Sequence, residues 1–189
     1  MERKVQGMRN YVERAKDFIK EVFPYIQDDM EYPWILRNKI RQYNADHTRN
    51  VKVMSGCARV ALLTSDYVVK FDYDEEEVQC IGGSQNEVYL YEIAKREGFD
   101  YLFAEITHVV WMNHDFYIMP RIYGINDDNG RGWQYMTYEE REWCKEHSLT
   151  DLHCGNYGFR NGHICIVDYG YQENLTECCH DSDESPSYC

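Results

Sequence analysis

The stretch of sequence that decides the fold reads LTDLHCGNYG over residues 149–158 and continues as FRNGHICIVDYG over residues 159–170. Asn-Gly at 161–162 is a strong hairpin signal, because both residues tolerate a positive φ. We therefore expect strands at 158–160 and 163–167. Asp151 and Asn156 precede this hairpin and Asp168 follows it. Asp and Asn are each common singly in turns and at strand ends. Three of them at this spacing around a hairpin are much less expected by chance, so the spacing indicates a shared function.

This spacing resembles the catalytic core of the protein kinase-like superfamily. It is closest to the aminoglycoside and small-molecule phosphotransferase branch, whose catalytic loop has the pattern D-L-H-x-x-N and precedes a hairpin that ends in D-x-G. The resemblance covers roughly residues 51–170. It implies that Asp151 orients the attacking hydroxyl and accepts its proton, while Asn156 and Asp168 hold magnesium against the nucleotide phosphates. It also implies that His153 organises the loop.

The order of the upstream segments agrees with this resemblance, because a kinase-like small lobe has a strand lysine, then a helix glutamate, then two more strands. Lys70 ends an apolar strand predicted at 67–71, and it resembles the lysine that pairs with nucleotide phosphates. Glu87 falls early in a helix predicted over 85–97. The resemblance implies an ion pair between Lys70 and Glu87, with Glu92 as the alternative partner.

Two further segments would contact the nucleotide by the same resemblance. Residues 116–123 occupy the place of the last small-lobe strand and the hinge between the lobes, so Met119, Arg121 and Ile122 would line the adenine site. The phosphate-covering loop at 54–60 contains one glycine, Gly56, where the pattern G-x-G-x-x-G has three. Arg59 either adds positive charge to this loop or faces solvent.

The remaining segments are predicted from their apolar periodicity. A period of three to four residues predicts helices over 8–26, which Pro24 helps to end, and 33–43, followed by a polar break at 44–50. Alternation predicts strands at 51–54, 59–63, 107–112 and 116–122, with a turn at 113–115. A helix over 138–147 begins with a capping box of Thr137 and Glu140, after a connector at 127–132.

These elements predict an α+β protein, and the resemblance implies a kinase-like bilobal fold. The N-lobe has a five-stranded antiparallel sheet with one main helix, and the reduced helical C-lobe carries the catalytic loop and the hairpin. The expected parts are a helical extension at 1–46, the N-lobe at 51–122, a minimal C-lobe at 123–172 and an acidic, disordered tail at 173–189. The helices that form the acceptor site in the family have no counterpart after Gly170.

Composition limits the expected partners and location. The 189 residues carry 20 Lys and Arg against 33 Asp and Glu, for a formal net charge of -13, which argues against affinity for nucleic acid or anionic membranes. With no apolar stretch of membrane-spanning length and no export signal, we expect a cytoplasmic protein. Its eight cysteines are expected to be reduced thiols. A zinc site is the other interpretation, with Cys178-Cys179-His180 as the close cluster.

Three functions remain open at this point. The first is an ATP- and magnesium-dependent phosphotransferase, a transferase of the kinase class, that acts on an unidentified hydroxyl of a small molecule or a protein. The second is a kinase-like pseudoenzyme or protein-binding module, with or without bound nucleotide. The third is nucleotidyl transfer from the same fold. The acceptor and the oligomeric state stay open.

Overall fold

The computed structural model describes residues 2–30, 32–56, 59–72, 83–123, 132–149, 152–153 and 155–170, with side chains from residue 11 onward except that of Pro33. The chain divides into two compact units. The first comprises residues 1–78 and 105–121, and the second comprises residues 79–104 and 122–189. The described elements include both helices and antiparallel strands, so the α+β prediction is confirmed.

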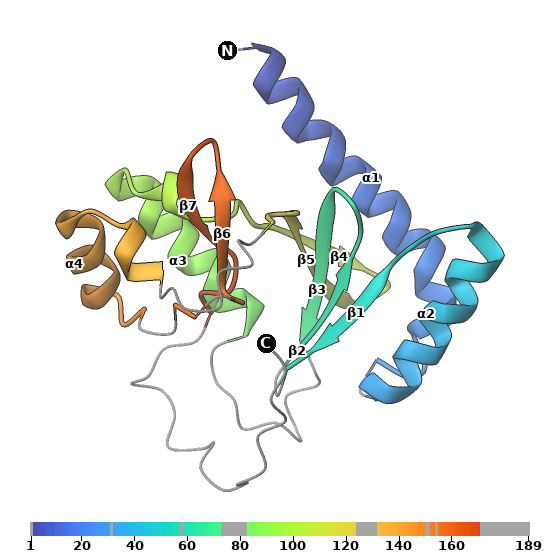
Figure 1. Ribbon diagram of the computed structural model, residues 1–189. Coiled ribbons are helices and arrows are strands. Elements are labelled where there is room, and N and C mark those ends of the chain that lie inside the picture. Colours follow the sequence, from blue (N-terminus) through green and yellow to red (C-terminus); the bar gives the residue numbers. More distant parts are fainter. Residues whose placement is uncertain are drawn as a thin grey trace, which may run out of the picture. The chain divides into compact units, whose positions relative to one another are not determined.

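The first unit contains a five-stranded antiparallel sheet in the order β1-β2-β3-β5-β4 (Figure 1). The strands are β1 (Lys52–Ser55), β2 (Arg59–Leu63), β3 (Tyr67–Asp72), β4 (Thr107–Trp111) and β5 (His114–Pro120). Their side chains alternate between the two faces of the sheet, as the period of two in the sequence predicts. The five-stranded antiparallel sheet is therefore confirmed.

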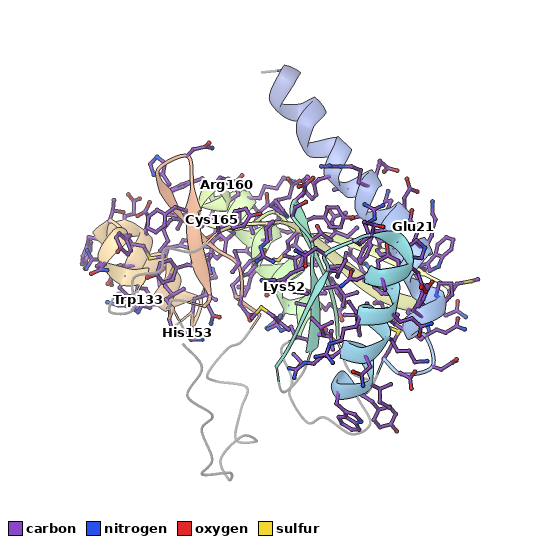
Figure 2. The ribbon with its side chains drawn as sticks, turned by 45° about the vertical axis from the view of Figure 1, so that its right-hand side comes forward. Glu21, Lys52, Trp133, His153, Arg160 and Cys165 are labelled. Atoms are coloured by element: carbon purple, nitrogen blue, oxygen red, sulfur yellow. The ribbon has the colours of Figure 1, made fainter. Side chains whose placement is uncertain are left out.

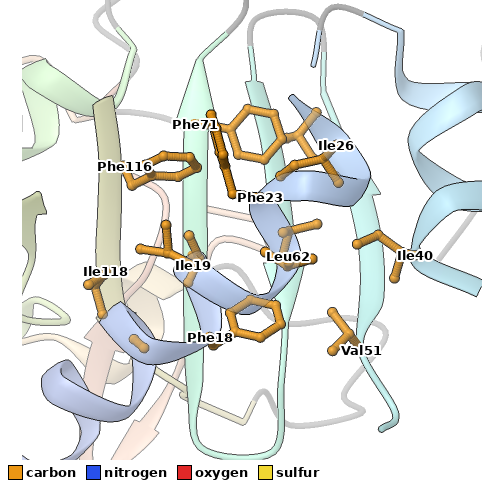
Figure 3. Packing of buried hydrophobic residues seen from close by; sticks show 14 of the residues in the cluster. Phe18, Ile19, Phe23, Ile26, Ile40, Val51, Leu62, Phe71, Phe116 and Ile118 are labelled. Carbon is orange, nitrogen blue, oxygen red and sulfur yellow. The ribbon is translucent and has the colours of Figure 1, made fainter. Parts of the chain in front are cut away.

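Helices α1 (Glu2–Ile26) and α2 (Pro33–His47) pack on one face of this sheet. Figure 3 shows Phe18, Ile19 and Phe23 of α1 against side chains of β2, β3 and β5. The apolar stripe of α1 and one set of alternate sheet residues form a single buried cluster, which includes Ala15, Val22, Ile26, Leu36, Ile40, Tyr43, Val60, Leu62, Val69, Phe71, Phe116 and Ile118. The two leading helices thus belong to the core of the first unit.

Several element boundaries in the first unit differ from the predictions. Helix α1 ends at Ile26, as predicted, with Pro24 in its last turn, but it begins at Glu2 instead of at residue 8. Helix α2 continues into the predicted polar break, where the Asn44 side chain bonds both the N–H and the C=O of Val51 at 2.9 Å. The turn between β4 and β5 is Met112-Asn113, both at positive φ, so β5 begins at His114.

The second unit is built around an aromatic core. Its described elements are α3 (Ser84–Glu97), the 3-10 helices η1 (Asp100–Leu102) and η2 (Gly132–Tyr135), α4 (Tyr138–Glu146), and the hairpin β6 (Tyr157–Arg160) and β7 (His163–Ile166). Phe103 packs edge-on against Trp143, with ring centroids 5.6 Å apart, and against Tyr169 at 4.8 Å. These three rings join the segment that follows η1, helix α4 and the segment after β7.

Two local predictions in the second unit, the capping box and the hairpin turn, are confirmed. Thr137 and Glu140 form the reciprocal capping box at the start of α4. Gly98 ends α3 with φ 84°, the left-handed conformation that glycine adopts without steric cost. Asn161 and Gly162 both have positive φ and close the β6–β7 hairpin, on which Figure 2 labels Arg160 and Cys165.

No helix in the part of the chain that the structure describes is both long and apolar enough to cross a lipid bilayer.

Candidate functional site

The residues that the sequence predicts for the site fall into both units. Gly56, Lys70, Met119 and Arg121 belong to the first unit, and four others belong to the second: Glu87, Ile122, Asn156 and Asp168. Asp151, the predicted catalytic base, lies outside the described residues. Each unit is therefore described by itself.

Lys70 lies on β3, on the face of the sheet opposite to α1 and α2. Its neighbours Val69 and Phe71 point into the helix-covered core, so strand alternation turns Lys70 the other way. In the register, Lys70 pairs with Tyr117, and Val68 pairs with Met119. Lys70 and Met119 therefore share one face of the sheet. Lys70 is only 6% exposed, which is unusual for a lysine.

Gly56 lies where β1 turns into β2. Its backbone N–H donates to the carbonyl of Arg59 at 2.9 Å, and residues 57 and 58 lie outside the described residues. A Cβ added at Gly56 would meet nothing within 4 Å. The backbone here is thus open, which permits the close approach of a ligand. The turn is short, as expected for a sequence with a single glycine.

Glu87 connects α3 to the D-Y-G segment at 168–170. It lies in the first turn of α3, and its side chain is 0% exposed. Its Oε1 accepts a hydrogen bond at 3.2 Å from the backbone N–H of Tyr169, which is 82 residues away in the sequence. A buried carboxylate needs such donors, since burial removes its water. The structure therefore brings Glu87 next to the residue that follows Asp168.

Asn156 and Asp168 lie at the open end of the β6–β7 hairpin. The N–H of Val167 donates to the carbonyl of Asn156 at 2.8 Å, which extends the ladder by one pair. Asn156 is 8% exposed, and its own N–H donates to the carbonyl of His153 at 2.9 Å. His153 in turn accepts from the N–H of Gly155 through Nδ1 at 3.0 Å. Glu87, Asn156 and the segment around Asp168 thus form one connected group within the second unit.

The donor types in this group fit a magnesium ion. Mg²⁺ prefers oxygen ligands and is usually bound by one or two carboxylates together with waters and substrate phosphates. Asn156 offers an amide oxygen and Asp168 a half-buried carboxylate, at the same end of one hairpin. Among the described residues, no three His, Cys, Asp or Glu side chains gather as a metal site. The Cys178-Cys179-His180 cluster lies outside them.

Sequence reasoning missed two side chains that hold the D-Y-G segment. The Tyr169 hydroxyl donates to the carbonyl of Ala104 at 2.8 Å, and the side chain is 1% exposed. Asn86 donates from Nδ2 to the carbonyl of Gly170 at 3.1 Å. No local pattern reveals these contacts, because their partners are 65 and 84 residues away in the sequence.

Gly158 on β6 allows the segment after β5 to come unusually close. A Cβ added there would lie 2.5 Å from the carbonyl oxygen of Tyr123 and 2.6 Å from Cγ2 of Ile122. The N–H of Phe159 donates to the same Tyr123 carbonyl at 3.3 Å. Ile122, which the resemblance places in the adenine site, is thus packed on the β6–β7 hairpin.

Two cysteines of the second unit are buried thiols outside any disulfide. Burial raises the pKa of Cys165 on β7 to about 11 and the pKa of Cys144 on α4 to about 12. The nearby Glu140 carboxylate also raises the pKa of Cys144, and Arg160 opposes the rise at Cys165. Both thiols are therefore inert at neutral pH. The other six cysteines of the chain lie outside the described residues.

No protein-family model matches the chain, and no curated protein matches it significantly. The kinase-like assignment consequently remains a proposal that is based on the motifs and on the contacts above.

Replacing Gly158 by alanine should destabilise the second unit. The new Cβ would collide with the backbone of Tyr123, so we expect a loss of roughly 1–3 kcal/mol in the free energy of unfolding. Gly56→Ala is the matched control, because its Cβ has open space and Gly56 has no positive φ. Denaturant unfolding of both variants measures the difference. Equal stabilities would contradict the close approach at Gly158.

The buried thiols should make the protein less stable at alkaline pH. Their pKa is higher in the folded state than the value near 9.0 for an exposed thiol, so the folded state keeps protons that the unfolded state loses. The free energy of unfolding should fall as the pH rises above about 9. Unfolding under reducing conditions at pH 8 and pH 10 measures this fall. Cys165→Ala should make the fall smaller, and an unchanged fall would show that Cys165 does not contribute.

Proposed function

We propose that the protein is an ATP- and magnesium-dependent phosphotransferase of the kinase-like class that acts on a hydroxyl acceptor. The observation that carries this proposal is the hydrogen bond between Glu87 and the backbone of Tyr169. It joins the helix that bears the predicted lysine partner to the segment that bears the predicted metal ligand Asp168. Two motifs that lie far apart in the sequence are thereby in contact.

The chemistry of phosphoryl transfer asks mainly for positioning and charge stabilisation. In this proposal Asn156 and Asp168 hold magnesium, whose charge offsets that of the nucleotide phosphates. Asp151 orients the acceptor hydroxyl and takes its proton. The hairpin supports this division of roles, because Asn156 directly precedes β6 and Asp168 follows β7 at the same end of the ladder.

Lys70 is proposed to hold the nucleotide phosphates while paired with Glu87. Both side chains are buried, Lys70 at 6% and Glu87 at 0% exposure. Met119 shares the face of the sheet that carries Lys70, and with Arg121 and Ile122 it is proposed to line the adenine site.

A nucleotide-binding module without transfer activity is the second candidate. The observation that favours it is the short β1–β2 turn closed by the Gly56–Arg59 hydrogen bond. A turn of this length with one glycine offers few backbone N–H groups to the phosphates, which weakens the hold on the transferred group. The two candidates share nucleotide binding and differ in turnover.

Mg-ATP should raise the melting temperature of the wild-type protein. Ligand at 100 times its Kd stabilises the native state by about 2.7 kcal/mol, which corresponds to a rise of roughly 5–10 °C for a chain of this size. Asp168→Ala should reduce the shift, whereas Asp28→Ala, an exposed aspartate of the first unit, should keep it. No shift of the wild type at saturating Mg-ATP would contradict both candidate functions.

Glu87→Gln should lower phosphate transfer from γ-labelled ATP at least about tenfold, since glutamine still accepts from Tyr169 but cannot neutralise Lys70. Glu92→Gln is the matched control, because Glu92 is exposed and pairs with Lys95 on the surface of α3. Equal activities of the two variants would reject the role of Glu87. If the wild type binds Mg-ATP but transfers no phosphate, the nucleotide-binding module is favoured. If label is transferred from α-labelled ATP, the reaction is nucleotidyl transfer.

A further inference from the structure

The backbone on both sides of Asp168 is fixed by hydrogen bonds. Before it, Val167 is tied to Asn156 through the 2.8 Å bond that extends the hairpin. After it, Tyr169 is tied to Glu87 through its N–H and to Ala104 through its hydroxyl. Asp168 itself is half-buried, so its carboxylate keeps partial access to solvent. A ligand residue is thus held between two anchored neighbours.

Asn86 supplies the next anchor along the chain. Its Nδ2 donates to the carbonyl of Gly170 at 3.1 Å. Asn86 and Glu87 are consecutive in the first turn of α3, and Tyr169 and Gly170 are consecutive after Asp168. Two side chains of one helical turn therefore hold two successive residues, Tyr169 through its N–H and Gly170 through its C=O.

Helix α3 is itself a rigid support for these two contacts. Its inner face is buried, including Leu90 and Ala94, and its C-terminal turn is tied to α4 by a 2.8 Å bond from Trp143 Nε1 to Glu97. A side chain that projects from such a helix can hold a loop more precisely than a side chain on another loop. Through its hydrogen bond to Gly170, Asn86 thus holds the segment that contains Asp168 in a fixed position relative to α3.

We propose that Asn86 is a positioning residue that keeps the carboxylate of Asp168 in place for magnesium. This inference rests on the proposed function, because it assumes that Asp168 binds the metal of a Mg-nucleotide complex. Asn86 does not touch the ligand and acts through the Gly170 carbonyl. An amide is required because that carbonyl is an acceptor, and a carboxylate at position 86 has no proton to donate to it at neutral pH.

Loss of such an outer contact typically weakens metal affinity by about 10–100-fold. Asn86→Asp and Asn86→Ala both remove the donor, and the alanine variant does so without adding charge. The control is Gln85→Ala, an exposed position on the same helical turn. Thermal melting without ligand establishes that each variant is folded.

Two measurements on the full chain test the role. Hydrogen exchange in the absence of ligand reports the protection of residues 166–170, which should fall in both Asn86 variants and not in Gln85→Ala. Binding of a fluorescent ATP analogue, titrated with Mg²⁺, gives the metal concentration for half-maximal binding. This concentration should rise about 10–100-fold in both Asn86 variants, while analogue binding in EDTA should stay the same as in wild type.

The outcomes separate this inference from the proposed function. If the wild type binds the analogue with Mg²⁺ and the Asn86 variants show the wild-type magnesium dependence, Asn86 has no positioning role and the proposed function stands. An effect in Asn86→Asp alone also overturns the role, because added charge then explains it. If the wild type shows no Mg²⁺-dependent binding, the proposed function fails, and the inference fails with it.

Discussion

The second unit depends on the burial of one carboxylate, that of Glu87. Such a group loses its hydration on folding, and the loss is offset only when hydrogen-bond donors or positive charge surround it. The N–H of Tyr169 is one such donor. The buried carboxylate of Glu87 needs this hydrogen-bond donor, so the backbone after β7 must bring the N–H of Tyr169 to it. The position of Asp168, which directly precedes Tyr169, follows from this path. A medium-sized apolar side chain at position 87 would bury as well, but it would not select this backbone path.

The first unit follows a different principle, because its organisation is set by apolar area. One face of the sheet is covered by α1 and α2, so one set of alternate strand residues enters their common core. The other set, which includes Lys70 and Met119, is left on the opposite face. Lys70 and Met119 are therefore buried outside the cluster that α1 and α2 form with the sheet.

Much of the fold could be predicted from the sequence, because its signals are local. The alternation in β2 and β3, the capping box at Thr137 and the turn at Asn161-Gly162 each act within a few residues. The extension of α2 through residues 44–47 was missed, since it depends on the contact of Asn44 with Val51. Glu87 is predicted as a site residue from its order relative to Lys70, whereas the contacts of Asn86 and Tyr169 are long-range and no local pattern predicts them.

The β6–β7 hairpin imposes a constraint on how this chain could change over evolutionary time. Asn156 and Asp168 stand at its open end, twelve positions apart, and the ladder of Tyr157 with Ile166 and Arg160 with His163 fixes their relation. Residues added in pairs, one on each strand, would move the turn outward and leave the open end intact. A single added residue would reverse the face of every side chain beyond it or force a bulge. Length variation in this hairpin should therefore be even-numbered.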